Sequence, residues 1–235
     1  MHNKIIASSG FTLVEIMVSL VISSFVFAGI YGVYSIQQST YRTQGQVAEL
    51  QQQLRSALDF MNRDIRMAGY DPGGVCGVNN DQGQAGLLKQ NSSEFKFEYC
   101  DRDSTGAMKL HIVTYRLDGS NLRRELQIEG PPSSIQTIAE GVDAMEFLYL
   151  TGNSPLAQPW EPPPRATVAK DTRIIRLSLL LRSVYPDPRH TDMATYTPAS
   201  GTAWSTLISG SANPPKDNYH RRLLVTSIEL RNVGL

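Results

Sequence analysis

Glu15 is the residue best placed to do chemistry in this chain, because its carboxylate stands near the start of a long apolar segment. It follows Gly10 and Phe11 closely, and no charge occurs between residues 16 and 41. An unpaired carboxylate at membrane depth is costly and usually has a functional reason. In a low dielectric such a group attracts an amine much more strongly than in water. Ion pairing with another molecule is therefore the chemistry that we expect of Glu15.

The other chemically active residues do not form the pattern of an enzyme. No histidine lies one helical turn from another, and no nucleophile motif such as GxSxG is present. The glycines near residues 73–86 lack the spacing of a phosphate-binding loop. The sequence therefore predicts a protein that is not an enzyme, has no catalytic residues and needs no cofactor. The scattered histidines are His2, His111, His190 and His220.

No metal site is predicted either. The chain lacks the CxxC or Cys/His spacing of a zinc site. Asp187, Asp192 and Asp217 could join a calcium-binding loop, since oxygen ligands are common in loops, but they do not have EF-hand spacing. A calcium loop stays open as an alternative.

The charge balance gives no reason to expect nucleic acid as a ligand. Lysine plus arginine and aspartate plus glutamate each total 22 in 235 residues, so the formal charge is zero. Two arginine pairs, 123–124 and 221–222, lie in predicted strands. Such pairs are usually solvated and protect strand edges from aggregation, and we expect the same here.

The N-terminal segment is long enough to cross a membrane. As a helix, the residues from Phe11 to Tyr34 would extend about 36 Å, against a hydrocarbon layer of roughly 30 Å. Lys4 precedes the segment and favours a cytoplasmic N-terminus. A secretory signal peptide cut after Ala28 and a plain uncleaved anchor are the alternatives, but both leave Glu15 unexplained.

A second helical pattern follows the apolar segment. Apolar residues recur every three or four positions from Val47 to Ala68, with a polar face between them. Gly69 is suited to end the helix, and Asp71-Pro72-Gly73-Gly74 prevents its continuation. We expect one helix of about 87 Å from Phe11 to Ala68. Its second, amphipathic half must cover a sheet.

After residue 74 the apolar pattern changes to the period of two that is typical of strands. A hairpin is predicted around Asp118-Gly119-Ser120, and an antiparallel sheet packed on the helix gives an α+β fold. Two Pro-rich excursions, 151–172 and 185–219, are too long for ordinary turns. Their tryptophans, Trp160 and Trp204, could anchor a partner or cover the edge of the core, and we favour the second.

The N-terminal pattern resembles the processing site and hydrophobic stem of type IV prepilins. Asp64-Ile65-Arg66-Met67-Ala68-Gly69-Tyr70, the hairpin, residues 173–183 and the C-terminal strand resemble the PilW family of minor pilins. The resemblance implies cleavage between Gly10 and Phe11 by the prepilin peptidase, N-methylation of Phe11, and a role for Glu15 in assembly. It also implies a low-abundance subunit in a complex at or near the fibre tip.

Export, which the N-terminus implies, bears on the two cysteines. Cys76 and Cys100 lie 24 positions apart, and one disulfide is expected in an oxidising compartment. Two free, buried thiols are the alternative.

We therefore expect a type IV pilin-like minor pilin that primes or caps the fibre and contributes to adhesion or motility, with a J-type minor pseudopilin of type II secretion as the alternative. Its expected partners are other minor pilins, the major pilin, the prepilin peptidase/methylase and the bacterial inner membrane, which it would cross once before joining the pilus. Four segments are expected: a leader over residues 1–10, an apolar membrane and assembly helix over 11–40, an amphipathic helix over 41–69, and a β-rich domain outside the cytoplasm over 70–235.

Overall fold

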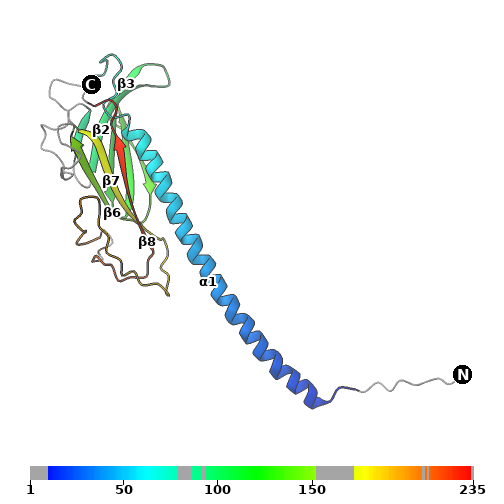
Figure 1. Cartoon of the computed structure of the whole chain (residues 1–235). Coiled ribbons are helices and arrows are strands. Elements are labelled where there is room, and N and C mark those ends of the chain that lie inside the picture. Colours follow the sequence, from blue (N-terminus) through cyan, green and yellow to red (C-terminus); the bar gives the residue numbers. More distant parts are fainter. Residues whose placement is uncertain are drawn as a thin grey trace. The chain divides into compact units, whose positions relative to one another are not determined.

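The structure of the protein is a computed structural model that describes residues 10–78, 86–90, 94–151, 172–207, 210 and 212–233. Within these described residues, one long helix, α1 (Leu13–Ile65), precedes eight strands (Figure 1). The chain divides into two units, Met1–Gly45 and Gln46–Leu235, and α1 contributes to both. The leader, residues 152–171 and Trp160 lie outside the described residues, apart from Gly10.

The helix ends close to the predicted position. Regular α-helix stops at Ile65, and the amides of Met67 and Ala68 then bond to carbonyls three residues back. Gly69 follows with a φ of 78°, the left-handed conformation in which glycine commonly ends a helix. Such tightening of the last turn satisfies carbonyls that an α-helix leaves unpaired.

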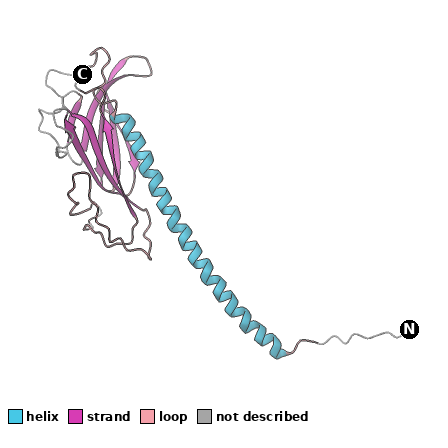
Figure 2. Ribbon diagram, in the orientation of Figure 1, coloured by secondary structure: helices cyan, strands magenta, loops and turns pink. Residues whose placement is uncertain are grey.

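The strands form two antiparallel sheets rather than the single predicted sheet. The first sheet has the order β1-β2-β3-β4-β5 and the second has the order β6-β7-β8 (Figure 2). The strand bounds are β1 (Leu87–Gln90), β2 (Glu94–Arg102), β3 (Met108–Asp118), β4 (Asn121–Ile128), β5 (Ser133–Ala139), β6 (Val142–Thr151), β7 (Thr172–Arg182) and β8 (Arg221–Glu229).

The predicted hairpin is present between β3 and β4. Asp118 pairs with Asn121, which leaves a two-residue turn at Gly119 and Ser120, and Gly119 has a φ of 56°. Strand β5 had not been predicted, because its sequence, SSIQTIA, lacks a clear alternation of apolar and polar residues. The chain leaves the first sheet after β5 and starts the second at Val142.

One core joins the second half of α1 to both sheets. The helix contributes a stripe at spacings of three and four, which the amphipathic pattern predicted. Phe95 and Phe97 of β2 belong to the same buried cluster as the stripe, and Phe95 also contacts Phe147 and Tyr149 of β6. The aromatic side chains thus connect the two sheets. The buried helix residues are Leu50, Leu54, Ala57, Met61 and Ile65.

The described part of the 185–219 excursion is an ordered loop that covers the second face of the β6-β7-β8 sheet. Trp204 and Tyr196 pack against a small cluster formed by Ala144, Leu180 and Leu207. This contact is the covering role that the sequence favoured for Trp204. It also explains why Leu180, on the face of β7 away from the main core, is fully buried.

Candidate processing and assembly site

The first residues of α1 form a reciprocal capping arrangement. The Glu15 amide donates to the Thr12 hydroxyl (3.3 Å), and the Thr12 amide donates to the Glu15 carboxylate (3.4 Å). Thr-x-x-Glu is the sequence signature of a capping box, which pairs amides that a helix start would leave free. Our reading of the sequence missed this role, although the spacing was visible. Within the chain, Glu15 therefore fixes the start of the helix.

Gly10 and Phe11 precede this cap in an open, exposed position. A Cβ atom added to Gly10 would meet no described atom within 4 Å, and Gly10 has no left-handed φ. The fold therefore does not require glycine at position 10. Phe11 is 81 % exposed. The bond between these two residues is accessible to another molecule.

The first half of α1 exposes its apolar side chains. None of its most apolar 18-residue stretch is buried. By length and composition this helix could cross a membrane. An apolar surface of this extent marks a site for lipid or for other protein helices. The large exposed residues include Leu13, Ile16, Leu20, Val21, Ile22, Phe25, Phe27, Ile30, Tyr31 and Tyr34.

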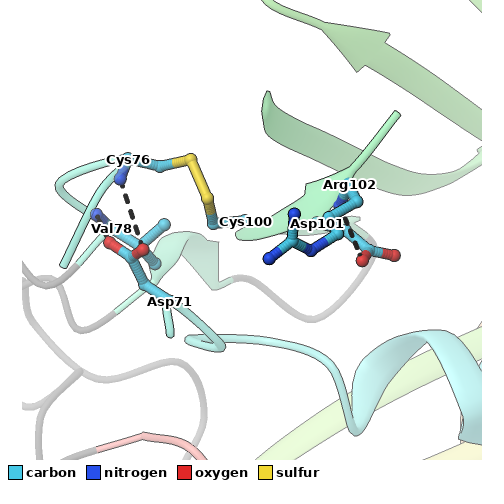
Figure 3. The surroundings of a disulfide bond; sticks show 6 residues. All are labelled: Asp71, Cys76, Val78, Cys100, Asp101 and Arg102. Atoms are coloured by element: carbon cyan, nitrogen blue, oxygen red, sulfur yellow. Dashed lines mark hydrogen bonds between the residues drawn. A yellow bond between two sulfur atoms is a disulfide. The ribbon is translucent and has the colours of Figure 1, made fainter. Parts of the chain in front are cut away.

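Cys76 and Cys100 form a disulfide, with 5.8 Å between their Cα atoms (Figure 3). The bridge ties the loop after α1 to strand β2, and the Cys100 amide also donates to the Tyr70 carbonyl (2.7 Å). Asp71 lies beside the bridge, where its two carboxylate oxygens accept from the amides of Cys76 (3.2 Å) and Val78 (3.1 Å). Of the two alternatives left open by the sequence, the bridge is the one present.

This group of one carboxylate and two sulfur atoms does not have the chemistry of a metal centre. Asp71, Cys76 and Cys100 bring their ligand atoms within 4.8 Å of one another. However, a metal binds the thiolate form of cysteine, and these sulfur atoms are bonded to each other. The Asp71 oxygens already accept backbone hydrogen bonds. The group therefore has a structural role, which is to link the loop after α1 to β2.

A partly buried polar contact fixes α1 on the first sheet. Asp64 of α1 accepts from the Tyr115 hydroxyl (2.8 Å) and forms a short ion pair with Arg124. Burial, and then the nearby Asp64 carboxylate, raise the pKa of Tyr115, so the hydroxyl stays protonated as a donor. The Arg124 guanidinium also lies over the Phe60 ring, 5.5 Å from its centroid. These contacts fix the position of α1 on the sheet.

Arg221 performs the same function for the 185–219 excursion. Its buried guanidinium donates to Asp143 of β6 (2.7 Å), to Asp192 (3.1 Å) and, with two nitrogen atoms, to Asp217 (2.6 and 2.7 Å). Two of the three aspartates considered for calcium are thus bound by a protein cation. Asp187 instead pairs with His220 at 3.2 Å.

The expectation that both arginine pairs are solvated was wrong for one member of each. Arg124 and Arg221 are the inward members, and their side chains are 11 % and 0 % exposed. Arg222 is exposed and Arg123 pairs with Asp118 near the surface, as expected of edge residues. Adjacent strand residues point to opposite faces, so the two arginines of a pair meet different surroundings: Arg124 meets α1, and Arg221 meets the excursion.

The predicted site residues belong to different parts of the chain. Gly10, Phe11 and Glu15 lie at or just before the start of α1, in the unit Met1–Gly45, and the disulfide belongs to the unit Gln46–Leu235. No catalytic constellation is formed among the described residues, in which the histidines lie in separate places apart from the stacked rings of His190 and His220. The described residues thus offer an exposed apolar helix and a separate, closed core.

Comparisons with known proteins agree with this arrangement. The sequence model of the family described as Type IV Pilus-assembly protein W matches residues 101–232, more than half of the chain. The prokaryotic N-terminal methylation motif matches residues 7–31, and the family Prepilin peptidase-dependent protein B matches residues 43–143. A comparison with curated proteins gave no match.

The fold is similar to that of a solved type IV-like pilin from Thermus thermophilus. The TM-score is 0.54 at 17 % sequence identity, and the match covers 79 % of this chain and 97 % of the other. At this identity the likeness concerns the fold, which is a long apolar N-terminal helix packed on antiparallel sheets. Together with the match to its distal strands and the methylation motif, these findings show that the chain is a pilin-like protein of the PilW family, with a prepilin leader.

Proposed function

We propose that this protein is a minor pilin that takes part in type IV pilus assembly, within a complex of minor pilins that primes or caps the fibre. One observation carries the proposal: an exposed apolar helix, with a single carboxylate in its first turn, leads into a globular unit whose own core is closed. Such a surface is stable only in lipid or against similar helices. A subunit that moves from membrane to fibre meets both environments.

The open Gly10–Phe11 bond supports processing by the prepilin peptidase. Hydrolysis of this bond would leave a carboxylate on Gly10 and a free amine on Phe11, which the same enzyme would then methylate. The fold has no need of glycine at position 10, so the requirement for it comes from outside the chain. A small residue without a Cβ allows the backbone to enter a narrow active site.

Glu15 would guide assembly through its charge. After cleavage, the Phe11 amine of a neighbouring subunit is a cation of the right kind to pair with the Glu15 carboxylate. In a low dielectric the attraction between them is strong, and leaving one charge without the other is costly. The pair would hold successive subunits in register.

The same features suggest the location of the protein. Lys4 precedes the apolar helix, which favours a cytoplasmic leader and a single crossing of the bacterial inner membrane. The Cys76–Cys100 disulfide fits an oxidising compartment for the globular unit. Other minor pilins and the major pilin would be its partners in the pilus, where it would contribute to adhesion or motility.

Deletion of the gene, combined with mass spectrometry of the mature chain, tests this function. We expect the chain to begin at N-methylated Phe11 and its deletion to reduce surface fibres at least tenfold. A J-type pseudopilin would instead show blocked protein secretion with normal fibres. An N-terminus at residue 29, or Gly10 still attached in membrane-extracted protein, would contradict the proposal.

A further inference from the structure

One face of α1 carries a group of polar and aromatic side chains just after its apolar stretch. The group consists of Tyr34, Gln37, Gln38, Tyr41 and Arg42, which we call the Tyr34–Arg42 face. Helix residues three and four positions apart are neighbours, so these side chains lie along one side of α1. All five are exposed, and they line an open groove of about 380 Å³. They can therefore contact one ligand together.

The donors of this face are available to a ligand, unlike the hydroxyl groups around them. The hydroxyls of Ser35, Ser39 and Thr40 each donate to a backbone carbonyl of α1, at 2.9, 2.8 and 3.0 Å. Within the part of the chain that the structure describes, the side chains of the Tyr34–Arg42 face form no hydrogen bond or ion pair. Tyrosine, glutamine and arginine all donate hydrogen bonds. The face thus offers several donors and one positive charge, that of Arg42.

The position of this face along the helix is that of a membrane surface. Arg42 is the first charged residue after Glu15 and lies 27 positions further along the chain. That separation corresponds to about 40 Å of helix, and a bilayer with its headgroups is about 40–45 Å thick. Tyrosine is enriched where lipid meets water. A helix that crosses the membrane from Glu15 therefore brings Tyr41 and Arg42 among the headgroups of the opposite leaflet.

We propose that the Tyr34–Arg42 face binds the phosphate of a phospholipid in the leaflet opposite the leader, and that this contact fixes the depth of α1 in the membrane. The inference rests on the proposed function, because it needs the helix to cross the membrane before assembly. A phosphate diester is an anion that only accepts hydrogen bonds, which matches the guanidinium of Arg42 and the donors of Gln38 and Tyr41. A carboxylate of another protein has similar chemistry, but phospholipid headgroups surround this part of the helix as soon as it inserts.

Solid-state NMR tests the contact directly. The sample is the full chain with ¹³C-labelled arginine, in vesicles of phosphatidylethanolamine and phosphatidylglycerol. We expect lipid ³¹P nuclei to dephase a guanidinium carbon signal, and Arg42→Gln to weaken this dephased signal at least fivefold. Arg55→Gln is the matched control, because Arg55 is also exposed on α1 but lies further from the apolar stretch. No dephasing in the wild type, or dephasing that survives Arg42→Gln, would overturn the proposal.

Native mass spectrometry of the full chain in a maltoside detergent separates a lipid phosphate from free phosphate. We expect the chain to retain phosphatidylglycerol at least fivefold more than diglucosyl diacylglycerol, which has two acyl chains but no phosphate. Inorganic phosphate at the same concentration should not remain bound, because it has no acyl chains to lie along the apolar part of the helix. Equal retention of the two lipids, or binding of inorganic phosphate in place of the lipid, would contradict the inference.

Photo-crosslinking in cells identifies the occupant. Benzoylphenylalanine in place of Gln38 should give an adduct with phospholipid in the membrane fraction, and adding Arg42→Gln should lower its yield at least fivefold. An adduct with another protein and none with lipid would rule the phosphate site out. Extraction of membranes with alkaline carbonate separates the two possible failures. If carbonate releases the chain, the membrane crossing and the proposed function fail. If the chain stays in the membrane without a lipid adduct, only the phosphate site fails.

Discussion

At the residue scale, Glu15 combines two roles that can be separated by substitution. Its carboxylate completes the capping box with Thr12, and its charge is available to a neighbouring amine. Glutamine can replace glutamate in a capping box, because an amide oxygen also accepts the Thr12 N–H. The cap therefore needs an acceptor, whereas assembly needs the charge.

Glu15→Gln should keep the helix start and lose incorporation into fibres. Thr12→Ala, the matched control, keeps the charge and removes the cap, at a cost of about 0.5–2 kcal/mol in helix stability. We expect Glu15→Gln to be processed normally and to reach the fibre at least tenfold less, by immunoblot of sheared pili. Greater loss with Thr12→Ala would assign Glu15 to capping alone.

The Asp64–Arg124 pair should carry more stability than any surface pair of the same sheet. Arg124→Ala leaves the partly buried Asp64 carboxylate with the Tyr115 hydroxyl as its side-chain donor, and should cost roughly 2–4 kcal/mol in the free energy of unfolding. Arg116→Ala is the control, since its contact with Glu125 is exposed and worth less than about 1 kcal/mol. Urea unfolding of the detergent-solubilised chain measures both. Equal losses would contradict the structural role.

At the scale of elements, the junction between α1 and β2 depends on close backbone approach. Gly86 has a φ of 78°, and an added Cβ would lie 2.5 Å from the Cα of Gly69. Gly74 has a similar φ of 66° but open space around it. The two glycines therefore differ in packing and share the same backbone conformation.

Gly86→Ala should destabilise the protein more than Gly74→Ala. An alanine in the left-handed conformation lowers the free energy of unfolding by about 1–2 kcal/mol, and this cost is common to both variants. The clash with Gly69 should add roughly 1–3 kcal/mol in Gly86→Ala, as overpacking does. Denaturant midpoints of the two variants give the comparison. Equal midpoints would show that the backbone at Gly69 moves freely away from residue 86.

The 185–219 excursion should loosen in acid. The hydrogen bond from Arg221 holds the pKa of Asp217 below its ordinary value. A carboxyl with a lower pKa in the folded state stabilises the fold above its unfolded pKa of about 3.9. That stabilisation is lost as the pH falls through the lower, folded value.

Fluorescence of Trp204 in a Trp160→Phe background can follow this change, since Trp204 packs on the cluster beneath the excursion. We expect a reversible shift below about pH 4 that precedes global unfolding. The Asp217→Asn variant should show the loosened signal already at neutral pH. A wild-type signal that changes only with global unfolding would exclude local release.

At the scale of the whole molecule, the surfaces of the two units suit different environments. The unit beginning at Gln46 carries the main core and the disulfide, whereas the described residues of the preceding unit expose their apolar side chains. We expect a chain of residues 46–235 to be soluble without detergent and to keep the Cys76–Cys100 bridge. Analytical ultracentrifugation and mass spectrometry under non-reducing conditions would check this. Aggregation of this chain would show that the apolar half of α1 also protects the globular unit.

Much of the fold and site could be predicted because it depends on local sequence. The apolar run, the amphipathic stripe, Gly69 as helix end and the Asp118–Ser120 turn are all encoded within a few residues of one another. The Gly10, Phe11 and Glu15 pattern is likewise local, although its roles in processing and assembly remain predictions. The capping box of Thr12 and Glu15 could have been predicted by the same means.

Only the tertiary structure decided which residues meet across long separations. The sequence by itself determined a long helix, its apolar first half and a series of strands, because hydrophobic period and turn residues act locally. It could not show that the strands divide into two sheets, that Arg124 binds Asp64, or that Arg221 forms ion pairs with three aspartates. Those contacts depend on which faces become buried, and burial is a property of the packed chain. The same holds for β5, whose open edge exists only because no described strand follows it in the sheet.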